Sequence, residues 1–598
     1  MVYARSRRGV SLGVVFVLSI VSAGGVLAQG LGAGTIQGIV KDPTGGVMQS
    51  VEVKITNALS GFSRTVMTDA MGKYAFGNLA PNSYHLSVDV QGFQPLARDV
   101  DVRSGVPVTL DLTLSLANAI SEVQVVGHVE DLVERDPTAH TDIDQSLIRK
   151  LPVETSSGGL NQVVMLASPG VVADSNGFFH PIGDHAETQF SVDNQPITDQ
   201  QSRLYSNQIS QDAVQSLEVI TGVAPAEYGD KSSLVVHIVT RSGLDSKPTG
   251  SASIGYGSFR SPGGEFNIGG GSHGIGDFVS ASALRTDRFL DPPELVALHD
   301  AGHNASLFNR LDVRTSPSAT FHLNVQLAQS GFDVPNTYDQ IAQTQNQNIT
   351  TFNIAPSYSQ TIGTDALFTA NGFVRRDRLT YSPSANPFDD TPATVSQDRT
   401  LSNYGGKADV TINAGRHSVK FGGTLAATRL HEQFTFGITD PTDPAFADEN
   451  GEFNEALRPF DLTSGGAPLN YNQSFTIKEQ AAYVQDDIKA GDVTFKLGVR
   501  VDHYDGLTSK SLVQPRLGVS YAVPGSGTVV RASYGRTMET PYNENLLLSA
   551  GYGLNGIFGV SAPVPPGVRN QGEIGIQQAL GRWLVADFGY FNKRTDNG

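Results

Sequence analysis

The sequence predicts a mainly β protein made of a small β-sandwich, a mixed α+β unit and an antiparallel transmembrane β-barrel, in that order. Three observations support this fold class. Short alternating strands broken by Gly, Pro and Asn fill residues 34–115, and short apolar helices interrupt the strands of residues 120–244. About fifteen segments with alternating polar and apolar residues then occupy residues 248–598, as expected for strands with one dry face.

Composition limits the classes of function that the chain can serve. It has 598 residues, a formal net charge of −17 and no cysteine. An acidic chain without a Lys/Arg-rich tract after its N-terminus does not fit a nucleic-acid partner. The lack of cysteine excludes disulfides, thiol catalysis and cysteine-ligated metals, and the length predicts more than one domain.

Residues 1–29 have the pattern of a cleaved signal peptide. Arg5, Arg7 and Arg8 precede an apolar run from Val10 to Val21, and small residues follow as far as Ala28. A single membrane-anchoring helix is the alternative, but the run is shorter than the roughly 20 residues that a helical span requires. Export is therefore expected, and a role in a membrane would fall to strands.

Residues 34–115 carry turn residues every eight to twelve positions or so, which is typical of a small sandwich. Asp42 and Asp69 precede Pro or lie close to Gly, and we expect them to accept hydrogen bonds in turns rather than to act as catalysts. The spacing resembles the carboxypeptidase regulatory-like domain, a transthyretin-like module. The matching residues are Gly38, Val40, Asp42, Gly45, Asp69, Gly72, Tyr74, Phe76, Pro81, Tyr84, Gly92 and Phe93.

Two short helices are predicted in the next region. Asp142 is expected to cap one that ends at Ile148, before Leu151-Pro152, and Leu160 to Leu166 forms the other.

The stretches FSVDNQPITD and VQSLEVITGVAPAEYGDKSSLVVHIVTRSG follow these helices. Together they resemble the plug domain of TonB-dependent outer-membrane receptors, which we expect to span residues 120–244. Asn194 replaces the family's usual Gly, a mild departure because Asn tolerates positive φ, and Ser232-Ser233-Leu234 replaces the usual Gly-Gly. The matching residues are Val192, Asp193, Leu217, Glu218, Val219, Ile220, Gly222, Pro225, Ala226, Tyr228, Gly229 and Val236 to Thr240.

In the last region short connections alternate with long polar ones, as in outer-membrane barrels with short periplasmic turns and long external loops. Period-two alternation alone fits both a soluble barrel, dry inside, and a membrane barrel, dry outside; the loop asymmetry favours the membrane barrel. In FHLNVQLAQS the face of Phe321 should therefore meet lipid, and the face of His322 the lumen or plug. In VTFKLGVRVDHY the charged Lys496, Arg500 and Asp502 should point inward.

The same region also resembles the barrel of that receptor family. The resemblance implies a partial barrel at residues 248–598, with about 15 of roughly 22 strands present, and a sequence truncated at its C-terminus. The matching residues are Tyr483, Gln485, Asp486, Gly498, Arg500, Asp502, Pro515, Arg516, Gly518, Ala532, Tyr534 and Pro541.

Candidate site residues are few. The glycine-rich stretch around Gly270 to Gly274 satisfies nucleophile-elbow and dinucleotide patterns, but a strand rather than a helix follows it, so we expect a turn. His180, Asp184 and His185 lie in a loop that is expected to face solvent, and plug-apex loops of the family touch ligand. The spacing matches no helical metal site, and we assign no catalytic residue, cofactor or metal.

Glu122, Val123, Gln124, Val125 and Val126 resemble the TonB box, a segment that pairs as an added strand with the energy-coupling protein. An ordinary first strand of the plug is the alternative.

The resemblance implies a receptor in the cell outer membrane, with plug and sandwich on the periplasmic side. Its partners would be a TonB-type energy-coupling complex, outer-membrane lipid and a small extracellular ligand, namely a siderophore, cobalamin, an oligosaccharide or a peptide. The alternative is a surface or adhesion-type barrel without transport. A passive porin is disfavoured because a plug would obstruct an open pore. We expect no enzymatic activity, because no residue pair has an assignable acid and base role.

Overall fold

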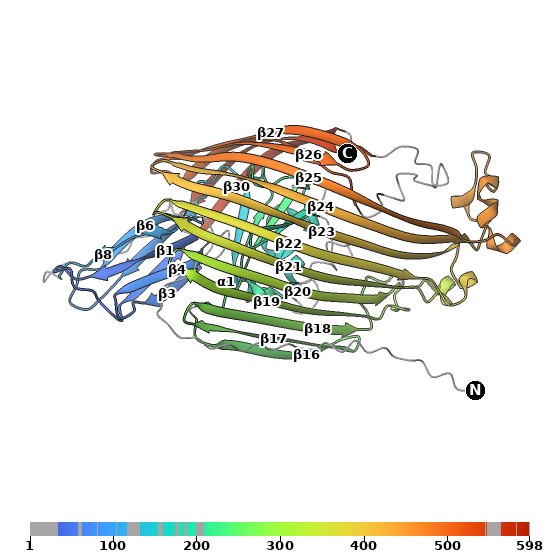
Figure 1. The fold of residues 1–598 in the computed structure, drawn as a ribbon, viewed down its shortest axis with the longest axis horizontal. Coiled ribbons are helices and arrows are strands. Elements are labelled where there is room, and N and C mark those ends of the chain that lie inside the picture. Colours follow the sequence, from blue (N-terminus) through green and yellow to red (C-terminus); the bar gives the residue numbers. More distant parts are fainter. Residues whose placement is uncertain are drawn as a thin grey trace.

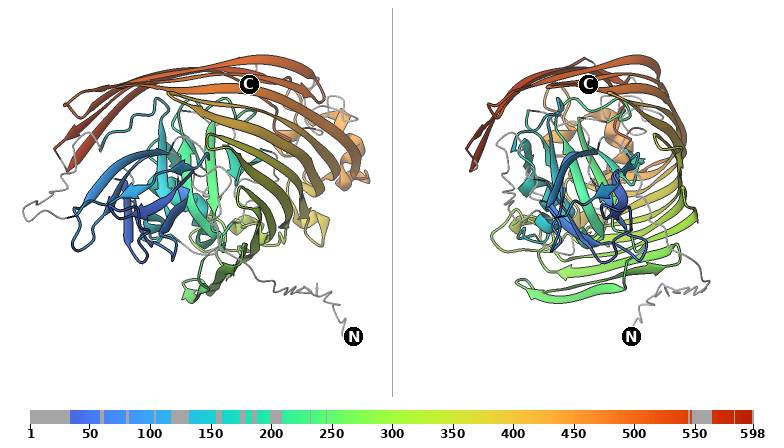
Figure 2. Two further views of the ribbon diagram at one scale, coloured as in Figure 1. Left: turned by 60° about the vertical axis from the view of Figure 1, so that its left-hand side comes forward. Right: turned by 90° about the vertical axis from the view of Figure 1, so that its left-hand side faces the viewer.

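The computed structural model shows three β units packed together (Figure 1). A small sandwich lies at one end of a large curved sheet, and a five-stranded sheet lies inside the curve (Figure 2). The structure describes residues 34–57, 62–79, 82–102, 105–116, 132–153, 159–173, 179–183, 188–198, 209–231, 233–244, 246–543, 546, 564–581 and 583–596.

The sandwich consists of two four-stranded sheets that enclose an apolar core in which Ile36, Ile55 and Phe76 are fully buried. Asp42 and Asp69 occupy turns, as predicted: Asp42 accepts hydrogen bonds from the backbone of Thr44 and Gly46 (2.9 and 2.8 Å), and Asp69 accepts them from that of Met71 and Lys73. The strands are β1 (Gly34–Lys41), β2 (Glu52–Asn57), β3 (Phe62–Met67), β4 (Lys73–Leu79), β5 (Asn82–Val88), β6 (Leu96–Val102), β7 (Val108–Thr109) and β8 (Leu112–Thr113).

The unit predicted to be the plug, for which we keep that name, is a mixed α+β unit around a sheet with the order β13-β12-β15-β14-β9. Strand β15 lies at its centre, and all seven of its residues are buried, in keeping with the apolar LVVHIVT sequence. The elements are β9 (His140–Asp144), α1 (Gln145–Ile148), α2 (Gly159–Ala167), β10 (Val171–Ala173), β11 (Phe179–Pro181), β12 (Thr188–Val192), β13 (Gln195–Ile197), η2 (Gln211–Ala213), β14 (Val214–Ile220) and β15 (Leu234–Thr240).

The second predicted helix is confirmed by α2, but the predicted cap of the first helix is wrong. Asp142 lies inside β9, where it pairs with Glu218 of β14, so it is extended and cannot begin a helix. Asp144 caps α1 instead, since its side chain accepts a hydrogen bond from the backbone N–H of Leu147 at 2.9 Å.

The large sheet contains fifteen antiparallel strands, each paired with its neighbour in the sequence, as the alternation predicted. Three of them have 22 residues, more than the roughly nine to fifteen expected. The strands are β16 (Thr249–Gly257), β17 (Ser261–Ser272), β18 (Ile275–Thr286), β19 (Gly302–Ser316), β20 (Ala319–Asp333), β21 (Asn346–Ile362), β22 (Ala366–Ser382), β23 (Ala393–Ala414), β24 (His417–Ile438), β25 (Leu469–Ala490), β26 (Val493–Asp505), β27 (Ser509–Val523), β28 (Thr528–Glu539), β29 (Gly567–Leu580) and β30 (Leu584–Asp596).

The two faces of this sheet differ as the alternation predicted. On β20, His322 is 2% exposed beneath the plug, whereas Phe321 is only half-buried. On β26, Val499 and Val501 are 43% and 44% exposed, while Arg500 and Asp502 between and beside them are buried. Apolar side chains therefore cover the outside of the curve, and polar side chains line the inside.

The two ends of the curved sheet also differ. Tight turns, such as the one from Ser272 to Ile275, join strands at the end that carries the sandwich, which we call the short-turn end; there Lys489 pairs with Asp101 of the sandwich. Longer segments lie at the opposite, long-loop end (Figure 1). They contain the 3-10 helices η3 (Tyr338–Gln340), η4 (Pro387–Asp389), η5 (Pro444–Phe446), η6 (Glu455–Phe460) and η7 (Leu462–Ser464).

Within the described residues, no helix has both the length and the apolar character that crossing a membrane would require.

Candidate functional site

The turn between β12 and β13 anchors the plug to the inner face of the fifteen-stranded sheet, which we call the barrel. Asp193 and Asn194 form this turn with positive φ values of 45° and 71°. The Asp193 carboxylate accepts hydrogen bonds from the backbone N–H and the hydroxyl of Thr240 (2.9 and 2.5 Å), which hold the turn against β15. It also accepts a hydrogen bond from Asn324 of β20 (2.6 Å) and pairs with Arg310 of β19 (3.4 Å). The predicted motif residues Asp193 and Thr240 thus meet at the lumen wall.

Arg310 of the barrel is buried and hydrogen-bonded at this contact between plug and barrel. It is 1% exposed, its Nε donates to Asp312 at 3.0 Å, and its Nη1 donates to the carbonyl and hydroxyl oxygens of Thr240 at 3.0 and 3.1 Å. Buried charged hydrogen bonds of this kind are stronger than neutral ones and fix geometry as well. The plug carboxylate therefore has a preformed cationic partner in the barrel.

The next residues of the same turn contact further strands. Asn194 accepts a hydrogen bond from Lys407 of β23 at 2.7 Å and donates one to Asp409 at 3.2 Å. The side-chain amides of Gln195 and Asn353 exchange two hydrogen bonds, of 2.8 and 3.0 Å. The tip of the plug is consequently tied to β19, β20, β21 and β23 through polar groups.

A second plug turn, Pro225 to Gly229, faces β23–β27. Its Glu227 carboxylate pairs with Lys420 of β24 and, at 3.5 Å, with Lys407 of β23. Burial on its own would raise the pKa of Glu227, but these two ammonium groups outweigh burial and lower the pKa to about 2. Glu227 is therefore ionised in the folded protein at any ordinary pH.

Guanidinium groups of the barrel hold the backbone of the same turn. Arg516 donates to the carbonyl oxygen of Ala224 at 2.7 Å, and Arg500 donates to that of Glu227 at 3.3 Å. A methyl group at Gly229 would lie 2.1 Å from Nε of Arg500, so any larger residue here would require the Arg500 guanidinium to move.

Two of the cavities between the plug and the barrel share lining residues. The loop-side cavity, about 70 Å³, is lined by plug residues such as Gln195 and by Thr428, Glu479 and His503 of the barrel. The sandwich-side cavity, about 210 Å³, is lined by residues of all three units, among them Asn82, Glu134, Glu218 and Lys496. Three residues line both cavities and so form the partition between them: Asn194, Glu227 and Tyr228.

The remaining predicted site residues are placed only in part. His180 lies on β11, where its Nδ1 is 3.0 Å from the carbonyl oxygen of Pro181, and it is not among the residues that line the two cavities. Asp184 and His185 lie outside the described residues, as does the TonB-box candidate Glu122 to Val126. Contact of His180, Asp184 and His185 with a ligand stays a prediction. Pairing of Glu122 to Val126 with a coupling protein also stays a prediction.

Sequence reasoning missed Glu227, Lys407 and Lys420. A signal for the two lysines was present, because both occupy inward positions on alternating strands, like the predicted Lys496 and Arg500. Their convergence on Glu227 depends on contacts between residues 180 or more positions apart. The glycine-rich stretch, by contrast, behaves as predicted: it runs along β17 into a turn at His273 and Gly274.

Models of known protein families match most of this chain. The model of the carboxypeptidase regulatory-like domain matches residues 35–115, and that of the TonB dependent receptor-like β-barrel matches residues 251–598, more than half of the chain. A curated relative, the TonB-dependent transporter Oar of Myxococcus xanthus, is 28% identical over 188 residues. That alignment covers 30% of this chain and 18% of the relative's length.

Solved structures share the fold at low sequence identity. The ferric enterobactin receptor of Pseudomonas aeruginosa has a TM-score of 0.59 and 16% identity, over 79% of this chain and 73% of that one. The FrpB iron transporter from Neisseria meningitidis has a TM-score of 0.58 and 14% identity, over 76% and 73% of the two chains. The ferric citrate transporter FecA has a TM-score of 0.56 and 17% identity, over 79% of this chain and 72% of that one. With its sandwich, plug and outward-facing apolar barrel surface, the chain belongs to the TonB-dependent receptor family of outer-membrane β-barrel proteins.

Proposed function

We propose that this protein is an outer-membrane receptor that takes up a scarce ligand by TonB-dependent active transport. The observation that carries the proposal is the attachment of the plug. Its two turns contact the lumen wall through ion pairs and hydrogen bonds, centred on Asp193 and Glu227, whereas the apolar core of the plug lies mostly within the plug itself. Polar contacts of this kind can be exchanged for water, so the plug can shift without exposing a large apolar surface.

In this proposal the long-loop end faces the outside of the cell, and the sandwich and plug lie on the periplasmic side. Outer-membrane barrels place their long loops outside and their short turns in the periplasm, which supports this orientation. A ligand would enter from the long-loop end and reach the loop-side cavity. The partition of Asn194, Glu227 and Tyr228 would then separate it from the sandwich-side cavity.

Energy would be supplied from the inner membrane through the segment Glu122 to Val126. Strand addition suits this task because it uses backbone hydrogen bonds, which carry force along the strand without requiring particular side chains. This segment precedes β9, one of the two edge strands of the plug sheet, so a pull on it would reach that sheet at the β9 edge.

The ligand class stays open among siderophores, cobalamin, oligosaccharides and peptides, because a fold does not fix its ligand. Two proteins of similar fold are a ferric enterobactin receptor and a ferric citrate transporter, and this favours ferric chelates as the first ligands to test.

The test is uptake by a Gram-negative host that lacks its own ferric-chelate and cobalamin receptors. Radiolabelled ferric enterobactin, ferric citrate and cyanocobalamin are offered to cells with and without a functional TonB complex. We expect accumulation of one ligand that requires both this protein and TonB. Accumulation that does not require TonB, or surface binding without accumulation of any ligand in the panel and in added oligosaccharide and peptide mixtures, would contradict the proposal.

A paired substitution tests the coupling segment. Val123→Pro with Val125→Pro removes two backbone N–H donors and should abolish uptake, because an added strand needs them. Val123→Thr with Val125→Thr keeps the donors and the β propensity, and should leave uptake close to wild type. Equal uptake by the two variants would mean that coupling occurs elsewhere in the chain.

A further inference from the structure

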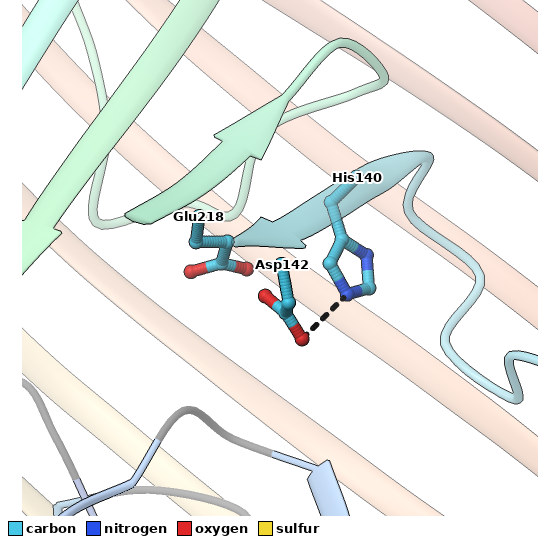
Figure 3. Close-up of side chains that lie close together, drawn as sticks. All are labelled: His140, Asp142 and Glu218. Atoms are coloured by element: carbon cyan, nitrogen blue, oxygen red, sulfur yellow. Dashed lines mark ion pairs between the residues drawn. The ribbon is translucent and has the colours of Figure 1, made fainter. Parts of the chain in front are cut away.

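The side chains of His140, Asp142 and Glu218 lie close together (Figure 3). Two of them, His140 and Glu218, line the sandwich-side cavity. His140 and Asp142 are two residues apart on β9 and so share one face of the sheet, and Glu218 lies directly opposite Asp142 on β14. One nitrogen or oxygen atom from each residue can be chosen so that all three lie within 4.8 Å of one another. The three side chains thus come from two neighbouring strands of the plug sheet, β9 and β14.

The two carboxylates of this group are poorly satisfied by the described residues. Like charges directly opposite each other on neighbouring strands destabilise a sheet. Asn82 of the sandwich donates to Oδ2 of Asp142 at 3.2 Å, but the buried Oδ1 of Asp142 has no hydrogen-bond partner. No hydrogen bond to the carboxylate of Glu218 is present in the described part of the chain either.

The imidazole of His140 is oriented as a ligand would be. Its side chain is 7% exposed, and its Nδ1 lies 2.9 Å from the carbonyl oxygen of Thr138. Because a carbonyl oxygen only accepts, Nδ1 donates, and Nε2 is directed at the carboxylates, 3.9 Å from Oδ2 of Asp142. A ring N–H bonded to a backbone carbonyl is the usual support of a metal-binding histidine.

We propose that His140, Asp142 and Glu218 form a binding site for a divalent transition-metal ion, with Zn²⁺ as the probe. One imidazole and two carboxylates suit Zn²⁺, which accepts nitrogen and oxygen ligands and has no strong geometric preference. The proposal goes beyond transport and does not depend on the proposed function.

The surroundings are compatible with such an ion. Tetrahedral bonds of roughly 2.0–2.1 Å place ligand atoms about 3.3 Å apart, so small side-chain rotations would close the group from its present spread. Glu134, with Oε2 at 3.9 Å from Nε2 of His140, or water from the cavity can supply a fourth ligand. Lys496 also reaches this region, but it pairs with Asp136 at 2.5 Å.

A bound ion would fasten β9 to β14 and, through Asn82 and Asp142, hold the sandwich beside the plug. Strand β9 pairs only with β14 within the described sheet, so it has a single neighbour to retain it. The metal would therefore fasten the first strand of the plug that the structure describes.

The test is Zn²⁺ binding to the purified full-length protein in detergent, prepared without an oligohistidine tag and stripped with EDTA. Competition with a chromophoric chelator should show one tight site. His140→Gln and Asp142→Asn should each weaken it by more than about 100-fold, since loss of even an outer partner of a ligand costs about 10- to 100-fold. His417→Gln is the matched control, because His417 also contacts a carboxylate, that of Asp486 at 2.7 Å, but is half exposed on the barrel. The His417→Gln variant should bind Zn²⁺ as tightly as the wild type does.

A second measurement covers variants that fail to fold. X-ray absorption at the Zn edge of the loaded wild-type protein should show one imidazole nitrogen with oxygen ligands. A site with several imidazoles, a site equally strong in the His140→Gln variant, or no binding tighter than that of Ca²⁺ would each overturn the proposal.

Discussion

Single residues at the boundary between plug and barrel carry opposite charges. The plug supplies the carboxylates of Asp193 and Glu227, and the barrel supplies Arg310, Lys407 and Lys420. Breaking a buried pair by removing one partner is costly, because the other charge is left in a poorly solvated place. Each of these residues is therefore a point where one substitution should loosen the plug.

Glu227→Gln should destabilise the plug by about 3 kcal/mol at neutral pH, the value that corresponds to a pKa lowered from 4.5 to about 2. The folded-state pKa is depressed, so this stabilisation is complete above pH 4.5 and disappears as the pH falls toward 2. The protection factors of the amides of residues 214–220, which correct for the intrinsic pH dependence of exchange, should fall over that window in the wild type, and in the variant they should be low already at pH 7.

Glu455→Gln is the control for this substitution. Glu455 also pairs with an arginine, Arg458, at 2.5 Å, but its side chain is 74% exposed in a long loop, and exposed pairs contribute little. Equal exchange rates for Glu227→Gln and the control would refute the role assigned to Glu227.

Gly229→Ala should also loosen the plug, by roughly 1–3 kcal/mol, because the added methyl group would collide with the Arg500 guanidinium. Gly572→Ala on β29 meets no atom within 4 Å and should be neutral. Thermal unfolding in detergent, with hydrogen exchange to separate plug from barrel, measures both. A neutral Gly229→Ala would mean that Arg500 moves aside freely.

For single residues, the sequence indicated which of several side chains matter but not which side chains they contact. The family motif singled out Asp193 and Thr240, and the structure brings them together. Nothing local marks Glu227 as the partner of Lys420, because 193 residues separate them. The ligating trio was missed for a related reason: Asp142 has the residue type and position of a helix cap, and only its pairing with β14 makes it extended.

For the strands of the barrel, the local sequence pattern was enough to predict the structure. Alternation in FHLNVQLAQS and VTFKLGVRVDHY predicted both the strands and their two faces, because a strand with one wet face must alternate. The length of β23, β24 and β25 was not predicted. Their long-loop ends run beyond the roughly ten residues that a bilayer requires, and there no lipid imposes an apolar face.

Val499→Arg on β26 tests the assignment of faces. An arginine on the lipid face near the middle of the bilayer should cost about 2–4 kcal/mol and reduce assembly into membranes. Val296→Arg, in a loop at the long-loop end where Val296 is 56% exposed, should assemble normally. The measurement is the heat-modifiable, folded fraction in outer-membrane extracts. Normal assembly of Val499→Arg would place that face in water.

In the molecule as a whole, one unit is enclosed by another, and the proposed transport requires them to move relative to each other. Their relative position could not be derived from sequence, because the plug tip contacts barrel side chains that lie 117 to 215 positions further along the chain. The order of the units was predictable, since each has its own pattern of strands and turns.

A reversible cross-link tests this motion, and the absence of native cysteine makes it a clean experiment. The side-chain amides of Gln195 and Asn353 meet at 2.8 Å, so their Cβ atoms are too far apart for a direct disulfide. In the Gln195→Cys and Asn353→Cys double variant, a short bis-methanethiosulfonate reagent should join the plug tip to β21 and block uptake until a reductant is added. Ser282→Cys with Ser306→Cys, treated in the same way, joins two neighbouring barrel strands and should not affect uptake. Uptake by the cross-linked plug–barrel variant would exclude movement at this contact.

The partition between the two cavities has an electrical consequence. Among the described residues, Asn194, Glu227 and Tyr228 line both spaces, so at this point one layer of side chains separates them. We expect the plug to block ion flow, and we expect the leak to depend on these three side chains. In planar lipid bilayers the intact protein should carry almost no current, and Tyr228→Ala should produce a steady ohmic conductance.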